Sequence, residues 1–261
     1  MLKNHPKDGK TKSVGRTLEI LSSFIDVSPR QRTIDVAQQL HMDISTVSRH
    51  LNTLLDWGFL GRDDVTGLYY PGVSIIALAG QALQSSELFR NASFTVQKLA
   101  FEYDVHAYLT MPQGTDIVYL SSCPSESTLD LMIPIGYHHP MYCSAMGRAM
   151  LAYMPSNEVD KILENSDMEQ YTAATLVDPK KIREELVQVR RKGYCVLVNE
   201  LVQNNGSIAV PIFDRMHQPI GAISVSERSY KMVEGDRKEE LSRATLDAAA
   251  VISAKMGWHP K

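Results

Sequence analysis

The sequence has little of what marks secreted or membrane-bound proteins. Its three cysteines, Cys123, Cys143 and Cys195, are far apart and form no CxxC pair. A disulfide framework is therefore excluded, and a reducing, cytoplasmic setting is expected. The longest apolar run, near residues 74–83, is too short to cross a bilayer. The first 13 residues lack the apolar segment of a signal peptide, so no membrane partner is expected.

Signatures of catalysis are also missing. The motifs GxSxG, HExxH and GxGxxG and the P-loop do not occur, so we expect neither an enzyme nor a bound cofactor. His138, His139 and Cys143 lie close together in the sequence, which leaves open a nucleophile–base pair or a metal- or redox-sensing regulator. Structural zinc usually needs about four ligands, and no second pair is evident. We therefore expect the two histidines to lie in a loop.

The composition that is present is that of a globular protein with one mildly basic end. The chain has 261 residues, enough for one large domain or two small ones, and a formal net charge of −3. Its first 33 residues nevertheless carry seven Lys and Arg against three Asp and Glu. This bias suits one end of the chain to approach a polyanion.

Residues 13–72 show the pattern of a winged helix-turn-helix domain. Residues 1–12 before it are polar and Lys-rich and are expected to be disordered. Apolar residues then recur at helical spacing in three short segments, and a strand–turn–strand pattern follows. The third helix starts after Asp43, a suitable N-cap, and directs Val47 and Leu51 to the core.

The outer arc of this third helix carries side chains that suit a DNA major groove. Arg49 suits guanine or phosphate, Asn52 suits adenine, and the helix start suits a phosphate. Winged helices also bind proteins, and Asp63 and Asp64 in the wing would repel phosphate. The residues expected to contact DNA are Arg16, Thr33, Ser45, Thr46, Ser48, Arg49, Asn52, Thr53 and Arg62.

The rest of the chain predicts an α+β fold. A linker helix over residues 73–89 carries small residues and could pack against a copy of itself. Residues 90–261 hold two groups of three strand-like runs with helices between and after them, which indicates an α/β domain on a mainly antiparallel sheet. The predicted strands cover residues 105–111, 116–123, 128–135, 194–200, 207–214 and 219–227, and the predicted helices cover 144–154, 179–192 and 237–256.

Five blocks together resemble the IclR family of bacterial transcription regulators. They are VGRTLEILSSF, STVSRHLNTLLDWGFL, YCSAMGRAMLAYMP, RRKGYCV and SIAVPIFDRMHQPIGAISVSE, in this order from Val14 onward. The resemblance implies a winged helix-turn-helix, a linker helix and a GAF-like effector-binding domain. It also implies a dimer or tetramer that binds double-stranded operator DNA, with a small organic acid as effector. A dimer would place two recognition helices on an approximate inverted repeat. Repressors are commoner in this family, but activators share the architecture.

The residues also give a chemical reason for an acidic effector. The helix that starts after Ser144 has free N–H groups at Ala145 and Met146, which hold a carboxylate without a cation. The resemblance implies that this helix start faces Ser207, Ser224 and Ser226 across the effector pocket.

One departure from the family pattern bears on the effector class. Leu197 and Val198 stand where acids are common in the family, and Asn199 and Glu200 follow. We therefore expect a pocket wall that has lost a carboxylate. Two effector classes remain open: a sugar acid or keto acid, and an aromatic acid. The expected effector-binding residues are Ser144, Ala145, Met146, Leu197, Asn199, Ser207, Ser224 and Ser226.

Overall fold

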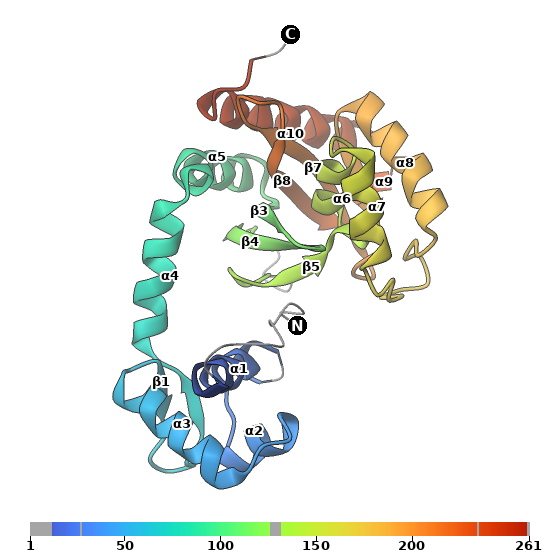
Figure 1. Ribbon diagram of the computed structural model, residues 1–261. Coiled ribbons are helices and arrows are strands. Elements are labelled where there is room, and N and C mark those ends of the chain that lie inside the picture. The colour runs from blue at the N-terminus through green and yellow to red at the C-terminus, as the bar shows by residue number, and fades with distance from the viewer. Residues whose placement is uncertain (1–11, 27, 126–131, 234, 260–261) are drawn as a thin grey trace. The chain divides into compact units, whose positions relative to one another are not determined.

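The computed structural model describes residues 12–26, 28–125, 132–233 and 235–259 (Figure 1). The chain divides into two compact units, residues 1–85 and residues 86–261. The predicted disordered tail, apart from Lys12, lies outside the described residues. No described helix is long and apolar enough to pass through a bilayer.

The first unit has the predicted winged helix-turn-helix architecture. Three helices precede a two-stranded hairpin and a fourth helix: α1 Lys12–Asp26, α2 Thr33–Gln39, α3 Ile44–Asp56, β1 Leu60–Arg62, β2 Tyr69–Pro71 and α4 Val73–Ser85. Ile20, Val47 and Leu51 are fully buried at its centre. Gln31 pairs with Tyr69 as an isolated bridge, so the chain before α2 adds to the wing.

The predicted linker helix over residues 73–89 is interrupted in the structure. α4 ends at Ser85, and α5 spans Glu87–Tyr103. Between them Ser86 takes an extended conformation, and its side chain accepts a hydrogen bond from the N–H of Phe89 at 3.2 Å. The cause is local, because a serine hydroxyl that caps the next helix competes with continuation of the previous one.

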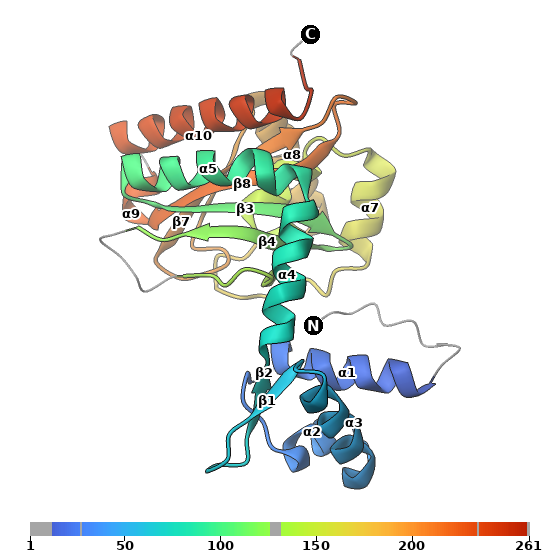
Figure 2. The same cartoon turned by 90° about the vertical axis from the view of Figure 1, so that its left-hand side faces the viewer.

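The second unit is built on a six-stranded sheet (Figure 2). The order is β5-β4-β3-β8-β7-β6 and every neighbouring pair is antiparallel, which confirms the predicted sheet type. The strands are β3 His106–Gln113, β4 Asp116–Cys123, β5 His138–Pro140, β6 Cys195–Val198, β7 Asn205–Phe213 and β8 Pro219–Arg228.

Two local predictions in this unit differ from the structure. His138 and His139 were expected in a loop, but they form β5 and pair with β4 at the sheet edge. The strand expected over residues 128–135 is not present at 132–135, and its first part lies outside the described residues. Residues 132–135 pair with no strand among the described residues, so their apolar character alone does not produce a strand.

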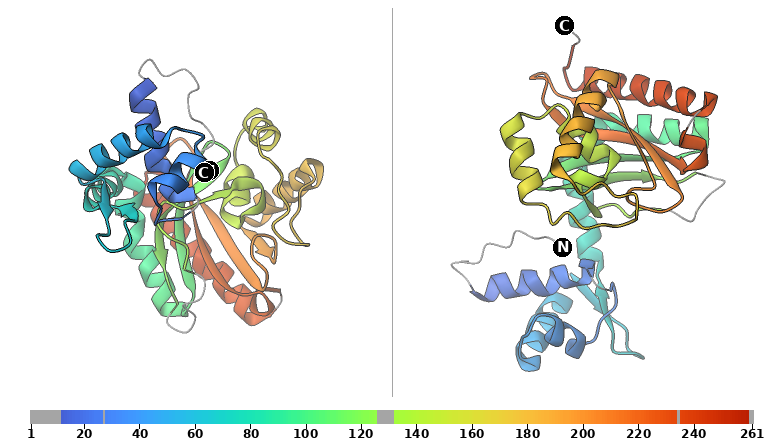
Figure 3. Two further views of the ribbon diagram at one scale, coloured as in Figure 1. Left: turned by 90° about the horizontal axis from the view of Figure 1, so that it is seen from below. Right: turned by 90° about the vertical axis from the view of Figure 1, so that its right-hand side faces the viewer.

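Helices cover both faces of this sheet. α5 and α10, Asp236–Lys255, lie side by side on one face (Figure 2). On the opposite face (Figure 3) the helix α6 packs on β7 and β8, with α7 and α8 outside it. The remaining elements are η1 Met141–Cys143, α6 Ala145–Leu151, α7 Ser156–Glu164, α8 Pro179–Lys192 and α9 Tyr230–Val233. The apolar core of this unit lies around α6.

Candidate functional site

The first candidate surface is the outer face of α3. Val47 and Leu51 are fully buried, as predicted. Ser45, Arg49, Asn52 and Thr53 are exposed, and Thr46 and Ser48 are partly exposed. Asp43 occupies the N-cap position, but its side chain makes no cap hydrogen bond. The N–H groups at the start of α3 therefore receive no side-chain cap from Asp43.

Contacts within the first unit position the polar side chains of α3. The Nε–H of Arg49 donates to the carbonyl of Ser45 at 3.3 Å. The Tyr69 hydroxyl on β2 donates to Oδ1 of Asn52 at 3.3 Å. Asn52 is thereby tied to the wing, and the helix and the hairpin present their side chains as one surface.

Two arginines outside the hairpin add positive charge beside Arg62, the cation of the wing itself. The Arg62 guanidinium lies 5.3 Å from the ring centroid of Tyr69, and that of Arg30 lies 5.5 Å from the centroid of Tyr70. Arg30 and Arg32 are both exposed and flank Gln31, which pairs with the wing. Sequence reasoning missed these two arginines, although the run PRQR signals them. The other predicted residues, Arg16 and Thr33, lie on α1 and at the start of α2, exposed and partly exposed respectively.

Asp63 has a structural role in the wing. Its Oδ1 accepts hydrogen bonds from the N–H groups of Val65 and Thr66 and from the Thr66 hydroxyl, at 3.1, 2.7 and 2.8 Å. These hydrogen bonds lower the pKa of the Asp63 carboxyl. The Asp63 carboxylate, which was expected to repel phosphate, therefore also stabilises the turn of the wing through three accepted hydrogen bonds.

The second candidate site is a small cavity between α6 and the sheet. It has a volume of about 40 Å³, room for about one water molecule. Of the predicted effector residues, Ser144, Ala145, Met146, Leu197, Ser207 and Ser226 line it. The lining also includes Tyr108, Tyr119, Ile133, Cys143, Glu200, Leu201, Val202 and Asn205, which the sequence analysis did not select.

The start of α6 forms one wall of this cavity. Ser144 is its N-cap, and the Ser144 hydroxyl accepts from the N–H of Gly147 at 3.1 Å. Ala145 and Met146 are buried behind it. Gly147 is required here, because a Cβ atom would lie 2.3 Å from the Cα and carbonyl oxygen of Met141. The first turn of α6 is thus packed directly against the backbone of η1.

Two serines form the opposite wall. Ser207 on β7 lies directly opposite Ser226 on β8, and their hydroxyl oxygens are 2.5 Å apart. Ser224 is two residues away on the same face of β8, but it does not line the cavity. It is fully buried, and its hydroxyl has no hydrogen-bond partner among the described residues.

Asn199 also lies outside the lining. It adopts a left-handed conformation, with φ of 63°, and its N–H donates to the carbonyl of Asn205 at 2.8 Å. Asn205 takes the place expected for Asn199: it lines the cavity, and its buried Oδ1 has no partner among the described residues. Asn199 follows the end of β6 and Asn205 begins β7, and sequence spacing does not tell which amide turns inward.

A buried ion pair supports the cavity wall. Arg148 on α6 is fully buried. Its NH1 and NH2 groups donate to the two carboxylate oxygens of Glu200 at 2.9 and 2.6 Å. NH1 also donates to Glu185 on α8, and Nε–H donates to the Tyr142 carbonyl, both at 2.6 Å. The expected loss of a carboxylate is therefore only partly right, because Glu200 keeps one in the wall and Arg148 balances it. The signal for Arg148 is a lone charge in the apolar run AMGRAML.

In the cluster of His138, His139 and Cys143, the thiol is buried and the two histidines are partly exposed. The Tyr119 hydroxyl and His139 Nδ1 share a hydrogen bond of 3.1 Å. Burial lowers the pKa of His139 to about 4 and raises the pKa of the Cys143 thiol to about 12. At neutral pH the thiol is protonated and is a poor nucleophile. Within the described part of the chain, no three His, Cys, Asp or Glu side chains are grouped to hold a metal ion.

Comparisons with known proteins match both units. The model of the IclR helix-turn-helix domain matches residues 13–64. The model of the bacterial transcriptional regulator IclR C-terminal domain matches residues 80–254. The chain is 29% identical over 259 residues to the HTH-type transcriptional regulator KdgR of Escherichia coli, covering 98% of each chain. It is 26% identical over 249 residues to KipR of Bacillus subtilis, covering 95% of this chain and 98% of KipR.

A solved structure has the same fold. It is an IclR homologue from Microbacterium hydrocarbonoxydans complexed with 4-hydroxybenzoate, with a TM-score of 0.81 and 19% identity. The match covers 94% of this chain and 99% of that one.

Proposed function

Because this chain belongs to the IclR family of ligand-responsive, DNA-binding bacterial transcriptional regulators, we propose that it represses a catabolic operon and is released by a small carboxylate. The observation that carries this proposal is the presence of two sites in one chain. One is the exposed polar face of α3, together with an arginine-flanked wing. The other is a buried cavity with a serine pair in its wall.

The DNA-binding surface consists of α3 and the wing. Arg49 and Asn52 are the residues for base edges, since both are exposed on the outer face and held by neighbours. Arg30, Arg32 and Arg62 supply positive charge for phosphates. These phosphate contacts make binding strongly salt-dependent.

The active form is a symmetric dimer or a pair of dimers. α4 has no buried residue, and it exposes Val73, Ile76 and Leu78 by 77%, 72% and 58%. A helix that presents apolar side chains without a partner fits self-association. Two copies of α3 related by a two-fold axis read an operator that is an approximate inverted repeat.

The cavity between α6 and the sheet favours a small keto acid or sugar acid. Ser207, Ser226 and the amide of Asn205 offer hydrogen bonds to carboxyl, carbonyl and hydroxyl groups. A volume of about 40 Å³ is smaller than any such acid, so the walls must move apart when one binds. The effector then favours whichever arrangement has the open cavity.

An aromatic acid is the second candidate effector for this cavity. The rings of Tyr108 and Tyr119 and the side chain of Leu197 form an apolar part of the lining. A ring needs a larger opening of the walls than a keto acid does.

A panel of carboxylates tests the effector assignment. Pyruvate, glyoxylate, keto-deoxy sugar acids and hydroxybenzoates are added to the full chain, and its thermal unfolding is followed. A carboxylate at about 100 times its Kd stabilises the native state by about 2.7 kcal/mol, which a melting curve detects. A response to one chemical class, lost in Ser207→Leu, supports the cavity. A response that survives Ser207→Leu places the effector elsewhere.

In vitro transcription from the regulated promoter tests the sign of regulation. A repressor lowers transcript yield, and the stabilising acid restores it. A yield that rises when the protein is added identifies an activator of the same architecture.

A further inference from the structure

A larger cavity lies at the edge of the sheet in the second unit. β6 pairs with β7 only from Cys195 onward, opposite Ala209, whereas β7 continues to Phe213. Residues 210–213 therefore have no strand beside them on that side among the described residues. The gap that results has a volume of about 400 Å³, which is within the range of small-molecule pockets.

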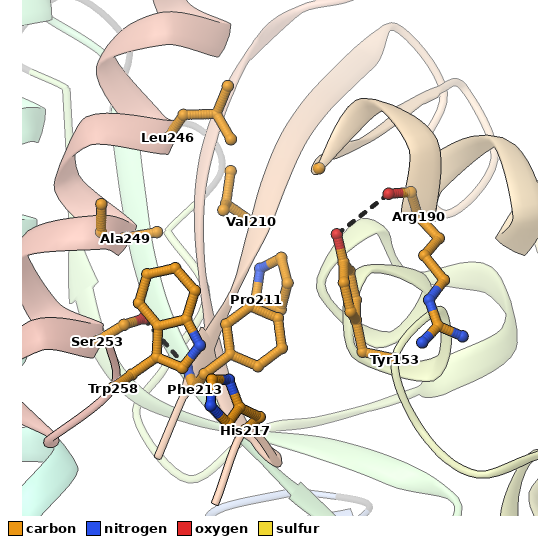
Figure 4. A pocket seen from close by; sticks show the side chains of 12 residues that line it. Tyr153, Arg190, Val210, Pro211, Phe213, His217, Leu246, Ala249, Ser253 and Trp258 are labelled. Carbon is orange, nitrogen blue, oxygen red and sulfur yellow. Dashed lines mark hydrogen bonds between the residues drawn. The ribbon is translucent and has the colours of Figure 1, made fainter. Parts of the chain in front are cut away.

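Three parts of the chain enclose this gap (Figure 4). One side is formed by Tyr153, which follows α6, and by Arg190 and Gly193 at the end of α8. The end of β7 forms the floor. On the other side are Leu246, Ala249 and Ser253 of α10 and Trp258, which follows it. No residue lines both this cavity and the one beside Ser207 and Ser226.

Aromatic rings dominate the lining and are fixed by one another. The rings of Tyr153 and Phe213 meet edge to face with centroids 4.9 Å apart. Phe213 stacks on Trp258 at 5.7 Å, and His217 meets Trp258 edge to face at 6.2 Å. The Tyr153 hydroxyl donates to the carbonyl of Arg190 at 3.3 Å. These contacts hold the rings in place before anything binds, which reduces the entropy lost on binding.

The gap is unsuited to another strand. Pro211 has no N–H to donate, and the N–H of Phe213 already donates to the Ser253 hydroxyl at 3.1 Å. A strand from a second copy would find few free donors along this edge. The edge therefore does not suit pairing with a strand, whereas the aromatic side chains of the lining suit the face of a ring.

The charge of the lining points to an anion. Arg190 lies with its guanidinium 5.7 Å from the Tyr153 ring centroid and is exposed at the rim. His217 is the other basic side chain, and no Asp or Glu is among the described residues that line the gap. In Figure 4 the Tyr153 ring stands between Arg190 and Phe213, so Arg190 is the cation at the rim, on the side of Tyr153 away from Phe213.

We propose that this cavity is a second small-molecule site, which takes a small planar aromatic acid. The ring occupies the gap beside Tyr153, Phe213 and Trp258, and the carboxylate is paired with Arg190 at the rim. The inference does not depend on the effector assigned to the smaller cavity.

Trp258 gives a direct assay with benzoate as the probe. The chain has two tryptophans, and Trp57 is 73% exposed, so Trp57→Phe leaves Trp258 as the single reporter. Benzoate should change its fluorescence in a saturable way, with a Kd that calorimetry reproduces. Cyclohexanecarboxylate, which has the same charge but no planar ring, should bind at least tenfold more weakly.

Matched variants locate the site. Ala250 is exposed and lines the cavity, so Ala250→Phe fills its mouth without repacking the core. It should weaken benzoate at least tenfold. Ala244→Phe makes the same change on α10 in the groove with α5 and should leave the Kd unchanged, as should Ser207→Leu in the smaller cavity. Arg190→Gln should also weaken benzoate.

Three results would overturn the proposal. The first is an absence of saturable binding. The second is binding that Ser207→Leu abolishes and Ala250→Phe does not. The third is a Trp258 signal that follows protein concentration and ignores benzoate, since this would make the cavity a contact between copies.

Discussion

Removing one member of the buried pair between Arg148 and Glu200 should destabilise the second unit strongly. The Arg148 side chain is fully buried and that of Glu200 is 11% exposed, so either charge left alone has little access to water. Breaking a buried pair by removing one partner costs about 3–5 kcal/mol. We expect Arg148→Met to lower the free energy of unfolding by that amount, and Glu200→Gln to lower it by less, because Arg148 keeps its pair with Glu185.

The third member of the network serves as the matched control. The Glu185 side chain is 48% exposed, and exposed ion pairs contribute about 0–1 kcal/mol. Burial raises the pKa of Glu185, although Arg148 opposes the shift. Glu185→Gln should therefore cost less than about 1 kcal/mol. This holds even though Glu185 accepts a hydrogen bond from Arg148 at 2.6 Å, as short as the shorter one that Glu200 accepts.

Urea unfolding followed by Trp258 fluorescence in the Trp57→Phe background measures these differences in the second unit. The double variant Arg148→Met with Glu200→Gln removes both charges and should recover more than half of the loss. The reasoning is wrong if Glu185→Gln and Glu200→Gln cost the same. It is also wrong if the double variant is as unstable as the sum of its two parts.

Four further predictions follow from individual contacts. Arg49→Ala should weaken operator binding at least tenfold, measured by fluorescence anisotropy. Arg243→Ala, which removes an exposed arginine on α10, should leave operator affinity unchanged. Equal effects of the two variants would place the DNA-reading face elsewhere. Ser207→Leu, which removes one hydroxyl of the serine pair, should abolish calorimetric binding of the stabilising carboxylate without altering operator affinity. The pKa of His139 is lowered from 6.5 to about 4, so between these pH values the unfolded chain binds a proton at His139 and the folded chain does not. The free energy of unfolding should therefore fall as the pH is lowered from 6.5 to about 4, by about 3 kcal/mol in total. His139→Gln should show a flatter pH dependence in urea titrations. Cys143, whose thiol pKa is raised to about 12 by burial, should resist iodoacetamide at pH 8 and react after denaturation; modification in the native state, read by mass spectrometry, would contradict its assigned burial.

Much of the fold could be predicted because its signals are local. The helices of the first unit follow from apolar residues at helical spacing, with Val47 and Leu51 inward as expected. Alternating runs also located β3, β4, β6, β7 and β8. The predicted boundaries were wrong where a single side chain determines them. At Ser86, a capping hydrogen bond ends α4 and starts α5, which the helical spacing of apolar residues does not reveal.

The site was less accessible to sequence reasoning because its residues meet only in three dimensions. Glu200 is 52 residues from Arg148, and nothing near either residue in the sequence points to the other. The choice between Asn199 and Asn205 depends on backbone conformation in the connection from β6 to β7. Tyr108 and Tyr119 line the cavity on strands whose patterns indicate only a buried sheet.

The contact between Gly147 and Met141 has a mechanical consequence. Since no side-chain atom fits between them, the first turn of α6 and η1 are in direct backbone contact. The N–H of Met141 also donates to the Thr115 carbonyl beside β4 at 2.9 Å, and Arg148 binds Glu185 on α8. A ligand that displaced Ala145 would therefore strain contacts that lead to the turn between β3 and β4 and to α8.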